Sequence, residues 1–220
     1  MKRIKLLGLA SVALIVMAVS ASSAFGFSEF NAAGKANPAG ITTKGAGGKA
    51  FFESVGGNKV ECEKSASTGK FVSHTEAVVE KLEYSGNCKL SGTISAKCPT
   101  ISIKELKVTP GTNAGKPVDW FQPKVGTTMA EFTCESTKVK VIGSVICLNK
   151  KPTLGLKGEV ECKQTAKGKQ EFKEGEFLGK TETGKFLEAE ATLGFFKLKE
   201  EDAQNTTEVI TSSAEVEQTP

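Results

Sequence analysis

The chain has 220 residues and a formal net charge of +4 at pH 7, from 29 basic and 25 acidic residues. Arg3 is its only arginine, and removing the three basic residues found among the first five positions leaves 26 lysines against 25 acidic residues. This balance argues against nucleic-acid binding, because proteins that bind nucleic acids usually carry a basic excess and use arginine to contact phosphates and bases.

A secretory signal peptide is predicted at residues 1–24. Basic residues come first, an apolar run follows at 6–19, and small side chains then extend to Ala24. Cleavage is expected after Ala24 or Gly26. The alternative is an uncleaved anchor, but an apolar run of about 14 residues is shorter than the roughly 18–20 needed to cross a bilayer. No membrane span is expected once the signal is removed.

Residues 25–50 are rich in glycine and alanine and show no apolar period. This composition predicts a flexible N-terminal segment without regular structure. A β-sandwich domain is then expected over residues 51–220.

Alternation of apolar and polar side chains predicts strands through most of this domain. Val60 and Cys62 alternate with glutamates, and the same tripeptide, Val-Glu-Cys, recurs at residues 160–162. A period of two places the apolar side chains on one face of a half-buried strand. Residues 75–85 fit a strand best, with a short helix over 75–82 as the alternative.

The most regular stretch is Ala130–Leu148, which predicts two strands around a short polar turn. Each strand carries a cysteine, Cys134 or Cys147, on its apolar side. The second strand has lysines on its other face at first and ends apolar on both faces, and Gly143 lies at the change. We therefore expect this strand to pass from a half-exposed to a fully buried position.

These patterns together predict an all-β fold, a disulfide-bonded antiparallel β-sandwich. The mature chain is long enough for one domain or for two closely packed β-subdomains. Both arrangements remain open from the sequence.

All six cysteines lie after the predicted signal peptide, and their even number predicts up to three disulfides in an exported protein. A metal site is disfavoured, because the chain has no C-x-x-C pair and only one histidine. Cys88 and Cys98 are paired because they are close in the chain, and Cys62 and Cys134 because both follow an apolar-x-Cys-Glu pattern. Of the fifteen connectivities that six cysteines allow, we predict Cys88–Cys98, Cys62–Cys134 and Cys147–Cys162.

Trp120 and Phe121 are the candidate ligand-binding residues. They lie between Pro117 and Pro123, which predicts an edge strand or a loop, because proline cannot donate a hydrogen bond to a strand ladder. Aromatic side chains in such a place can stack on sugar rings or insert into a partner. The alternative is that Trp120 fills the core.

No catalytic residue, metal ligand or cofactor is predicted. A serine hydrolase needs a nucleophile and a base, but the chain has no G-x-S-x-G motif and His74 is its only imidazole. We interpret His74 as a partly exposed strand residue. Three disulfides would leave no free thiol as a nucleophile, and no two of the many glutamates stand out as a glycosidase pair.

One pattern within residues 51–216 resembles a group of secreted proteins of soil actinobacteria that has no established activity. Its most specific part here is Phe132-x-Cys134 followed by Val139-Lys140-Val141-x-Gly143-Ser144-Val145-Ile146. The resemblance implies a β-rich, cysteine-containing, exported protein and supplies no catalytic residues.

Two functions are carried forward. The first is a non-catalytic protein of the cell envelope or extracellular space that binds a surface component, a glycan or a protein partner. The alternative is a secreted glycoside hydrolase that uses a glutamate pair. A cleft with two facing carboxylates would favour the hydrolase, and an exposed Trp120 would favour binding.

Overall fold

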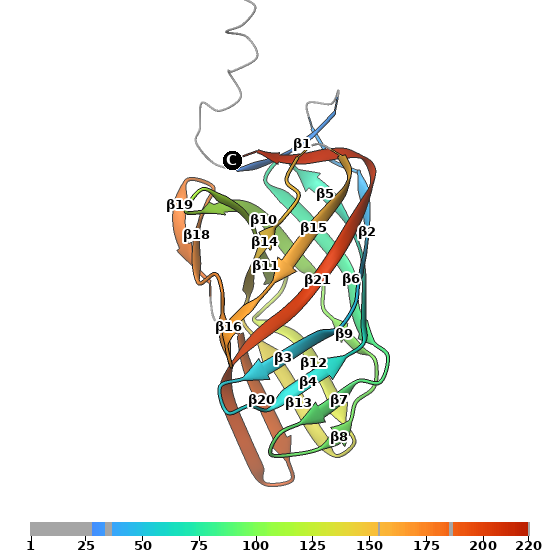
Figure 1. The fold of residues 1–220 in the computed structure, drawn as a ribbon, viewed down its shortest axis with the longest axis vertical. Coiled ribbons are helices and arrows are strands. Elements are labelled where there is room, and N and C mark those ends of the chain that lie inside the picture. The colour runs from blue at the N-terminus through green and yellow to red at the C-terminus, as the bar shows by residue number, and fades with distance from the viewer. Residues whose placement is uncertain (1–27, 34–36, 154, 185–186, 220) are drawn as a thin grey trace, which may run out of the picture.

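The structure is a computed structural model that describes residues 28–33, 37–153, 155–184 and 187–219 (Figure 1). The predicted signal peptide lies outside these residues. The described chain folds into strands joined by turns and loops, and its strand pairs are antiparallel throughout. No helix in this part of the chain is long and apolar enough to span a membrane.

In chain order, the strands are β1 (Glu29–Ala32), β2 (Thr42–Gly47), β3 (Ala50–Ser54), β4 (Lys59–Cys62), β5 (Lys64–Ser73), β6 (Glu76–Ser85), β7 (Lys89–Ser91), β8 (Ala96–Lys97), β9 (Ile101–Ile103), β10 (Leu106–Asn113), β11 (Lys116–Pro123), β12 (Thr128–Cys134), β13 (Thr137–Ile142), β14 (Val145–Asn149), β15 (Gly155–Cys162), β16 (Gln164–Ala166), β17 (Lys169–Gln170), β18 (Glu174–Phe177), β19 (Lys180–Thr183), β20 (Leu187–Leu193) and β21 (Phe196–Thr219).

The strand pairings close eight strands into a ring. These strands lie in the upper half of Figure 1. Their order is β21–β2–β5–β6–β10–β11–β14–β15 and back to β21. We call this the eight-strand ring. Each of its strands has a hydrogen-bonded neighbour on both sides, so the ring pairs backbone groups that an open sheet would leave free at its edges.

A second group of strands continues the sheet beyond the ring, in the lower half of Figure 1. β6 pairs with β9 beyond its contact with β10, and β21 pairs with β20 and β3 before it meets β15 and β2. β9, β12, β13 and β20 follow one another on one side, and β3, β4, β7 and β8 follow on the other. We call these the second strand group. It is not a separable domain, because β6 and β21 run through both halves.

The predicted fold class is confirmed, since the chain is all-β, antiparallel and disulfide-bonded. The opposing layers expected of a sandwich are here the facing walls of a sheet that curves round on itself. The half-buried strands keep the period of two: in β4, and in β12 from Ala130 to Cys134, buried positions alternate with exposed or partly exposed ones.

The expectation of a flexible segment at residues 25–50 is wrong for the residues that the structure describes there. β2 is an inner strand of the ring, paired with β5 and β21. Its glycines serve close packing: a Cβ on Gly45 would lie 2.1 Å from Ser67 Oγ, and one on Gly47 would lie 2.3 Å from Ser65 Oγ. The glycines that suggested flexibility are instead needed for close packing, because they leave room for the serine side chains of the neighbouring strand β5.

Two of the three predicted disulfides are wrong and one is confirmed. The bridges are Cys62–Cys88, Cys98–Cys134 and Cys147–Cys162. β7 lies between β4 and β8, and the registers continued by one residue place Cys88 opposite both Cys62 and Cys98. Cys98 N indeed donates to Cys88 O at 2.9 Å, but the sulfur of Cys88 bonds across the other neighbour, to Cys62. Cys88 and Cys98 are therefore close together, as predicted, but they are not bonded through their sulfur atoms.

The Ala130–Leu148 stretch contains three strands where two were predicted. β12 and β13 form the expected hairpin within the second strand group, and β13 also pairs with β20. Gly143, with a φ of 114°, separates β13 from β14. β14 lies outside the second strand group and pairs with β11 and β15 in the ring. The change from half-exposed to buried at Gly143 thus marks the transfer of the chain from one group to the other.

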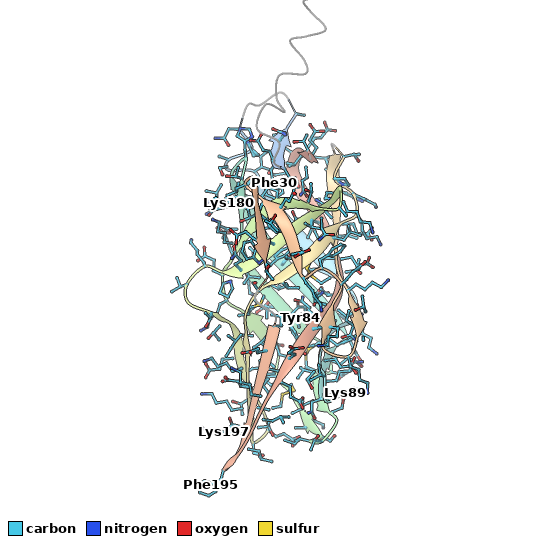
Figure 2. All side chains as sticks on the ribbon, turned by 90° about the vertical axis from the view of Figure 1, so that its left-hand side faces the viewer. Phe30, Tyr84, Lys89, Lys180, Phe195 and Lys197 are labelled. Carbon is cyan, nitrogen blue, oxygen red and sulfur yellow. A yellow bond between two sulfur atoms is a disulfide. The ribbon has the colours of Figure 1, made fainter. Side chains whose placement is uncertain are left out.

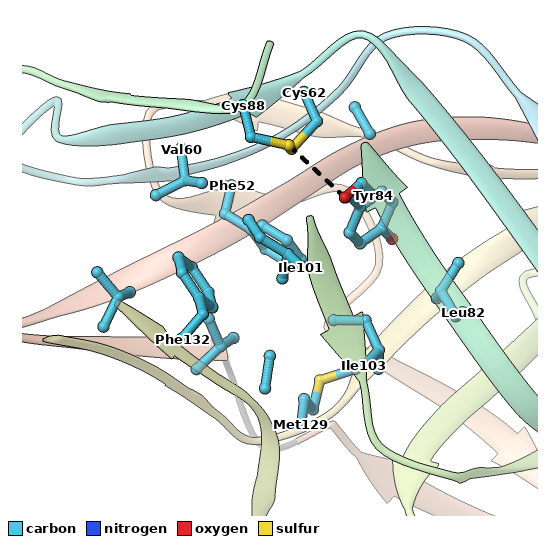
Figure 3. Close-up of a cluster of buried hydrophobic side chains, with 14 of the residues drawn as sticks. Phe52, Val60, Cys62, Leu82, Tyr84, Cys88, Ile101, Ile103, Met129 and Phe132 are labelled. Carbon is cyan, nitrogen blue, oxygen red and sulfur yellow. Dashed lines mark hydrogen bonds between the residues drawn. A yellow bond between two sulfur atoms is a disulfide. The ribbon is translucent and has the colours of Figure 1, made fainter. Parts of the chain in front are cut away.

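The strand prediction for residues 75–85 is confirmed by β6, and the helix alternative is excluded. β6 carries Tyr84 into the core between the two groups, where its ring meets Phe52 edge-on at 5.6 Å (Figure 3). Ile101, Ile103 and Met129 complete this part of the core and are at most 5% exposed. One continuous cluster joins the ring to the second strand group, so the two halves are packed together as well as hydrogen-bonded.

Replacing Cys62 and Cys88 together by alanine is expected to lower the free energy of unfolding by about 2–4 kcal/mol, because the unfolded chain loses its cross-link. Urea unfolding followed by circular dichroism measures this change. Non-reducing peptide mapping of the unmodified protein should recover Cys62 joined to Cys88. A fragment that joins Cys88 to Cys98 would contradict the structure.

Candidate ligand-binding cavity

The eight-strand ring encloses a cavity of about 150 Å³. Its walls are the side chains that the period of two directs inward. On β21, for example, Thr206, Glu208 and Ile210 line the cavity, whereas Val209 between them is 43% exposed. The cavity is thus a direct product of ring closure, which turns one face of each strand into an interior.

Most of the lining is apolar. Strands from all round the ring contribute apolar side chains to it, and these include Val79, Leu106, Phe121, Val145, Val160 and Ile210. Phe30, on β1, also lines the cavity, and its ring meets Phe71 edge-on at 4.9 Å. In Figure 2, Phe30 lies near one end of the molecule and Tyr84 near its middle, so the cavity extends between these levels.

Asp119 is a buried carboxyl group in this lining. It lies on β11 two residues before Phe121, and both side chains face inward. Asp119 is 4% exposed, and its Oδ1 has no hydrogen-bond partner. Burial raises the pKa of this carboxyl from 3.8 to about 7, because the charged form is poorly solvated in the ring.

Glu208 is a second carboxyl group, on the β21 wall. Its Oε2 accepts a hydrogen bond from Ser67 Oγ at 2.8 Å, and its Oε1 has no partner. Thr206 projects from the same face of β21, and its Oγ1 is also without a partner. Both residues are less than 9% exposed. Burial and, to a smaller extent, the charge of Glu208 raise the pKa of the Tyr84 phenol well above its usual value.

Two glutamines connect the lining to the surrounding strands. Gln218 Nε2 donates to Ser28 Oγ and to the carbonyl oxygens of Gly111 and Val118, at 3.1–3.2 Å. Gln204 Nε2 donates to Tyr84 Oη at 2.5 Å. The amide donors of both side chains are therefore engaged with the protein itself.

Part of the cavity lining lies where β14 and β15 diverge. These two strands share a ladder of only two residue pairs, Leu148↔Glu161 and Asn149↔Val160. The exposed Lys151 and the partly exposed Gly155 lie beyond that ladder and line the cavity. The β14–β15 connection therefore contributes exposed residues to the lining.

The structure places the two predicted binding residues on opposite faces of β11. Phe121 lines the cavity. Trp120 faces out of the ring, where it packs against Phe177 with ring centroids 5.1 Å apart and donates from Nε1 to Ser144 Oγ at 3.0 Å. It belongs to a small satellite core with Val118 and Ile146, and thus it is partly buried beneath β18.

The expectation of an edge strand or loop around Trp120 is wrong. β11 pairs with β10 along its whole length and with β14 over residues 118–121. Pro117 and Pro123 lie just outside the β14 ladder, where β11 needs no donor towards that neighbour. The prolines mark the limits of one ladder and do not expose the strand.

His74 takes no part in the cavity. Its Nδ1 lies 3.0 Å from the carbonyl oxygen of Phe30, and the carbonyl of His74 accepts from Phe30 N at 2.6 Å. Within the described ranges, no three potential metal-ligating side chains come together. The six cysteines are all engaged in bridges, and none is a free thiol.

Sequence reasoning missed Asp119, Thr206 and Glu208. Asp119 carried a signal, since it interrupts the apolar run Val118-Asp-Trp-Phe. Glu208 shares a strand face with Thr206 and Ile210, and a face that carries threonine and glutamate looks solvated in the sequence. Only ring closure shows that this face is inside.

Comparison with protein-family models, curated proteins and solved structures finds no match. The feature that most distinguishes the fold is the cavity, because it combines an apolar lining with buried oxygens that the protein leaves without partners.

Replacing Asp119 by asparagine is expected to change how stability depends on pH. In the unfolded chain this carboxyl ionises near its usual pKa of 3.8, and in the folded protein near 7, so the folded form is progressively disfavoured as the pH rises between those values. The variant lacks this loss. The two proteins should be similarly stable near pH 4, and the variant should be more stable at pH 8 by up to about 4 kcal/mol.

Urea unfolding of both proteins at pH 4, 6 and 8 measures this difference. The exposed Glu176 offers a control, and Glu176→Gln should follow the unmodified protein at each pH. A constant difference between Asp119→Asn and the unmodified protein across this range would contradict a buried, unpaired carboxyl at position 119.

Proposed function

We propose that this is an exported, non-catalytic protein that binds a small, mainly apolar ligand inside the eight-strand ring. The observation that carries the proposal is the cavity of about 150 Å³ with buried, unpartnered oxygens in its wall. Buried polar atoms normally have partners, and a site that leaves several without one is suited to a ligand that supplies them.

Its place of action is proposed to be extracytoplasmic, either secreted or in the cell envelope. Three disulfides are typical of proteins that mature in an oxidising compartment. The signal peptide predicted from the sequence is in keeping with the same location. No cofactor is part of this proposal.

The size of the cavity limits the ligand. An apolar protein cavity of about 150 Å³ is able to hold a molecule such as benzene. The apolar lining, with Leu106, Phe121 and Val145 among its members, favours a compact hydrocarbon body. A surface glycan or a protein partner would need an exposed binding face, and Trp120, the residue expected to provide one, packs against Phe177.

The alternative of a glycoside hydrolase receives less support. Such an enzyme needs two carboxyl groups that face each other across a cleft open to a sugar chain. Asp119 and Glu208 are carboxyl groups of one cavity, but they lie on strands that are not neighbours, in a largely apolar interior. This arrangement favours storage or transport of a small molecule over attack on a polysaccharide.

Gly158 offers a way to fill the cavity. It pairs with Ile210 in the β15–β21 register, so a side chain there would share the inward face of Ile210. The heavy atom nearest to an added Cβ is Ile210 Cβ, at 4.0 Å, which leaves room for a side chain. Gly158→Leu should therefore occupy space that a ligand would use.

Toluene is the probe for this test, applied to the full, oxidised chain. The unmodified protein should bind it at millimolar concentration or below, and Gly158→Leu should weaken binding at least tenfold. Chemical-shift changes in two-dimensional NMR spectra measure the affinity and show that each variant is folded. Val209→Leu, which changes the exposed neighbour of Ile210, is the control and should bind like the unmodified protein.

Absence of toluene binding, or equal binding by Gly158→Leu, would count against the proposal. Hydrolysis of polysaccharides by the same oxidised protein, lost in Glu208→Gln, would favour the enzyme instead.

A further inference from the structure

The polar atoms that the cavity leaves without partners are oxygens. They are Asp119 Oδ1, Thr206 Oγ1 and Glu208 Oε1, and each belongs to a residue at least nine-tenths buried. An oxygen acceptor buried in an apolar wall without a donor is costly, and a carboxylate oxygen most of all. The ligand that suits this wall best is one that brings hydrogen-bond donors.

Three side-chain donors of the lining are already in use. Ser67 Oγ donates to the other oxygen of Glu208, at 2.8 Å. The side-chain amides of Gln204 and Gln218 donate to Tyr84 Oη and to backbone carbonyls, respectively. These groups cannot turn towards Glu208 Oε1 without giving up the bonds that hold neighbouring strands together.

The charged residues of the lining also favour a ligand that donates hydrogen bonds. Lys151 is the one basic residue in the described lining, and it is exposed, 3.6 Å from Glu159. The inner wall holds the carboxyl groups of Asp119 and Glu208 without an opposing cation. A cationic donor would make charge-assisted hydrogen bonds there, which are stronger than neutral ones.

We propose, on the basis of the proposed function, that the ligand is a small organic amine bound as its ammonium ion. The ammonium group donates to Glu208 Oε1 and to Thr206 Oγ1, which project from the same face of β21. The apolar body, about the size of a benzene ring, lies against the inward aliphatic side chains. Val160, directly opposite Glu208 in the β15–β21 register, is the first of these.

Three probes of nearly equal shape test this assignment: benzylamine, benzyl alcohol and toluene. They share one ring and differ in carrying an ammonium, a neutral donor or no polar group. Each is titrated into the full, oxidised protein at pH 7.5 and constant ionic strength, and its dissociation constant is measured by NMR or calorimetry. Benzylamine should bind at least tenfold more tightly than toluene and more tightly than benzyl alcohol.

Glu208→Gln keeps the shape of the side chain and removes its charge. It should weaken benzylamine binding at least tenfold and change toluene binding by less than threefold. Glu176→Gln is the control, because Glu176 is exposed on β18 and is not part of the cavity lining. It should leave the preference for benzylamine almost unchanged.

The outcomes separate the two proposals. If toluene binds as tightly as benzylamine, or if Glu208→Gln keeps the preference for the amine, the ammonium assignment is wrong and the apolar cavity function survives. If benzyl alcohol equals benzylamine, a donor is required but a charge is not, which also overturns the assignment. If none of the three probes binds, both proposals fail. The probe series needs only the unmodified protein, so it decides even if Glu208→Gln does not fold.

Discussion

The backbone of β21 is the constraint on which the rest of the structure depends. This 24-residue strand pairs with β20 and β15 along one edge and with β3, β2 and β1 along the other. Without it, the ring would be an open sheet with two free edges, and the second strand group would lose the link between its two sides. The buried residues of its middle, Asp202, Gln204, Thr206 and Glu208, also make it the most polar wall of the interior.

The cavity beside this polar wall depends on the size of the inward-facing side chains. A ring of this size has room for side chains and little else, and smaller or larger inward residues decide how much space remains. Here glycine at position 158 leaves space beside Ile210, while Gly45 permits close approach of Ser67 and Glu208. Packing is thus tight on the β2–β5 side and loose at β15. The space beside β15 follows from this asymmetry.

The sequence predicted local structure well and long-range partners poorly. The period of two located β4, β6, β12 and β13, because each strand buries one face regardless of its neighbour. Disulfide partners depend on register between distant strands, and Cys88 lies opposite two cysteines, so no local pattern could decide its bond. Glycine at positions 45 and 47 looked like flexibility because its use, close packing against β5, depends on a strand pairing that is invisible in the sequence. For the same reason Phe121 was identified and Glu208 was not: an aromatic residue stands out anywhere, whereas a glutamate is unusual only once its surroundings are known.

Closure by β21 also dictates when the protein can fold. Ser28 Oγ donates to the carbonyl of Thr219 across 191 residues, and β2 and β3 acquire their partners on β21 only after more than 140 intervening residues. Such non-local contacts carry a large entropic cost of loop closure and slow the folding reaction. Neither half of the molecule is complete until β21 has been synthesised, so the chain stays open while it is made. With this folding order the strands on either side of β21 stay unjoined until the last strand is present, and the three bridges then hold a structure that closes last.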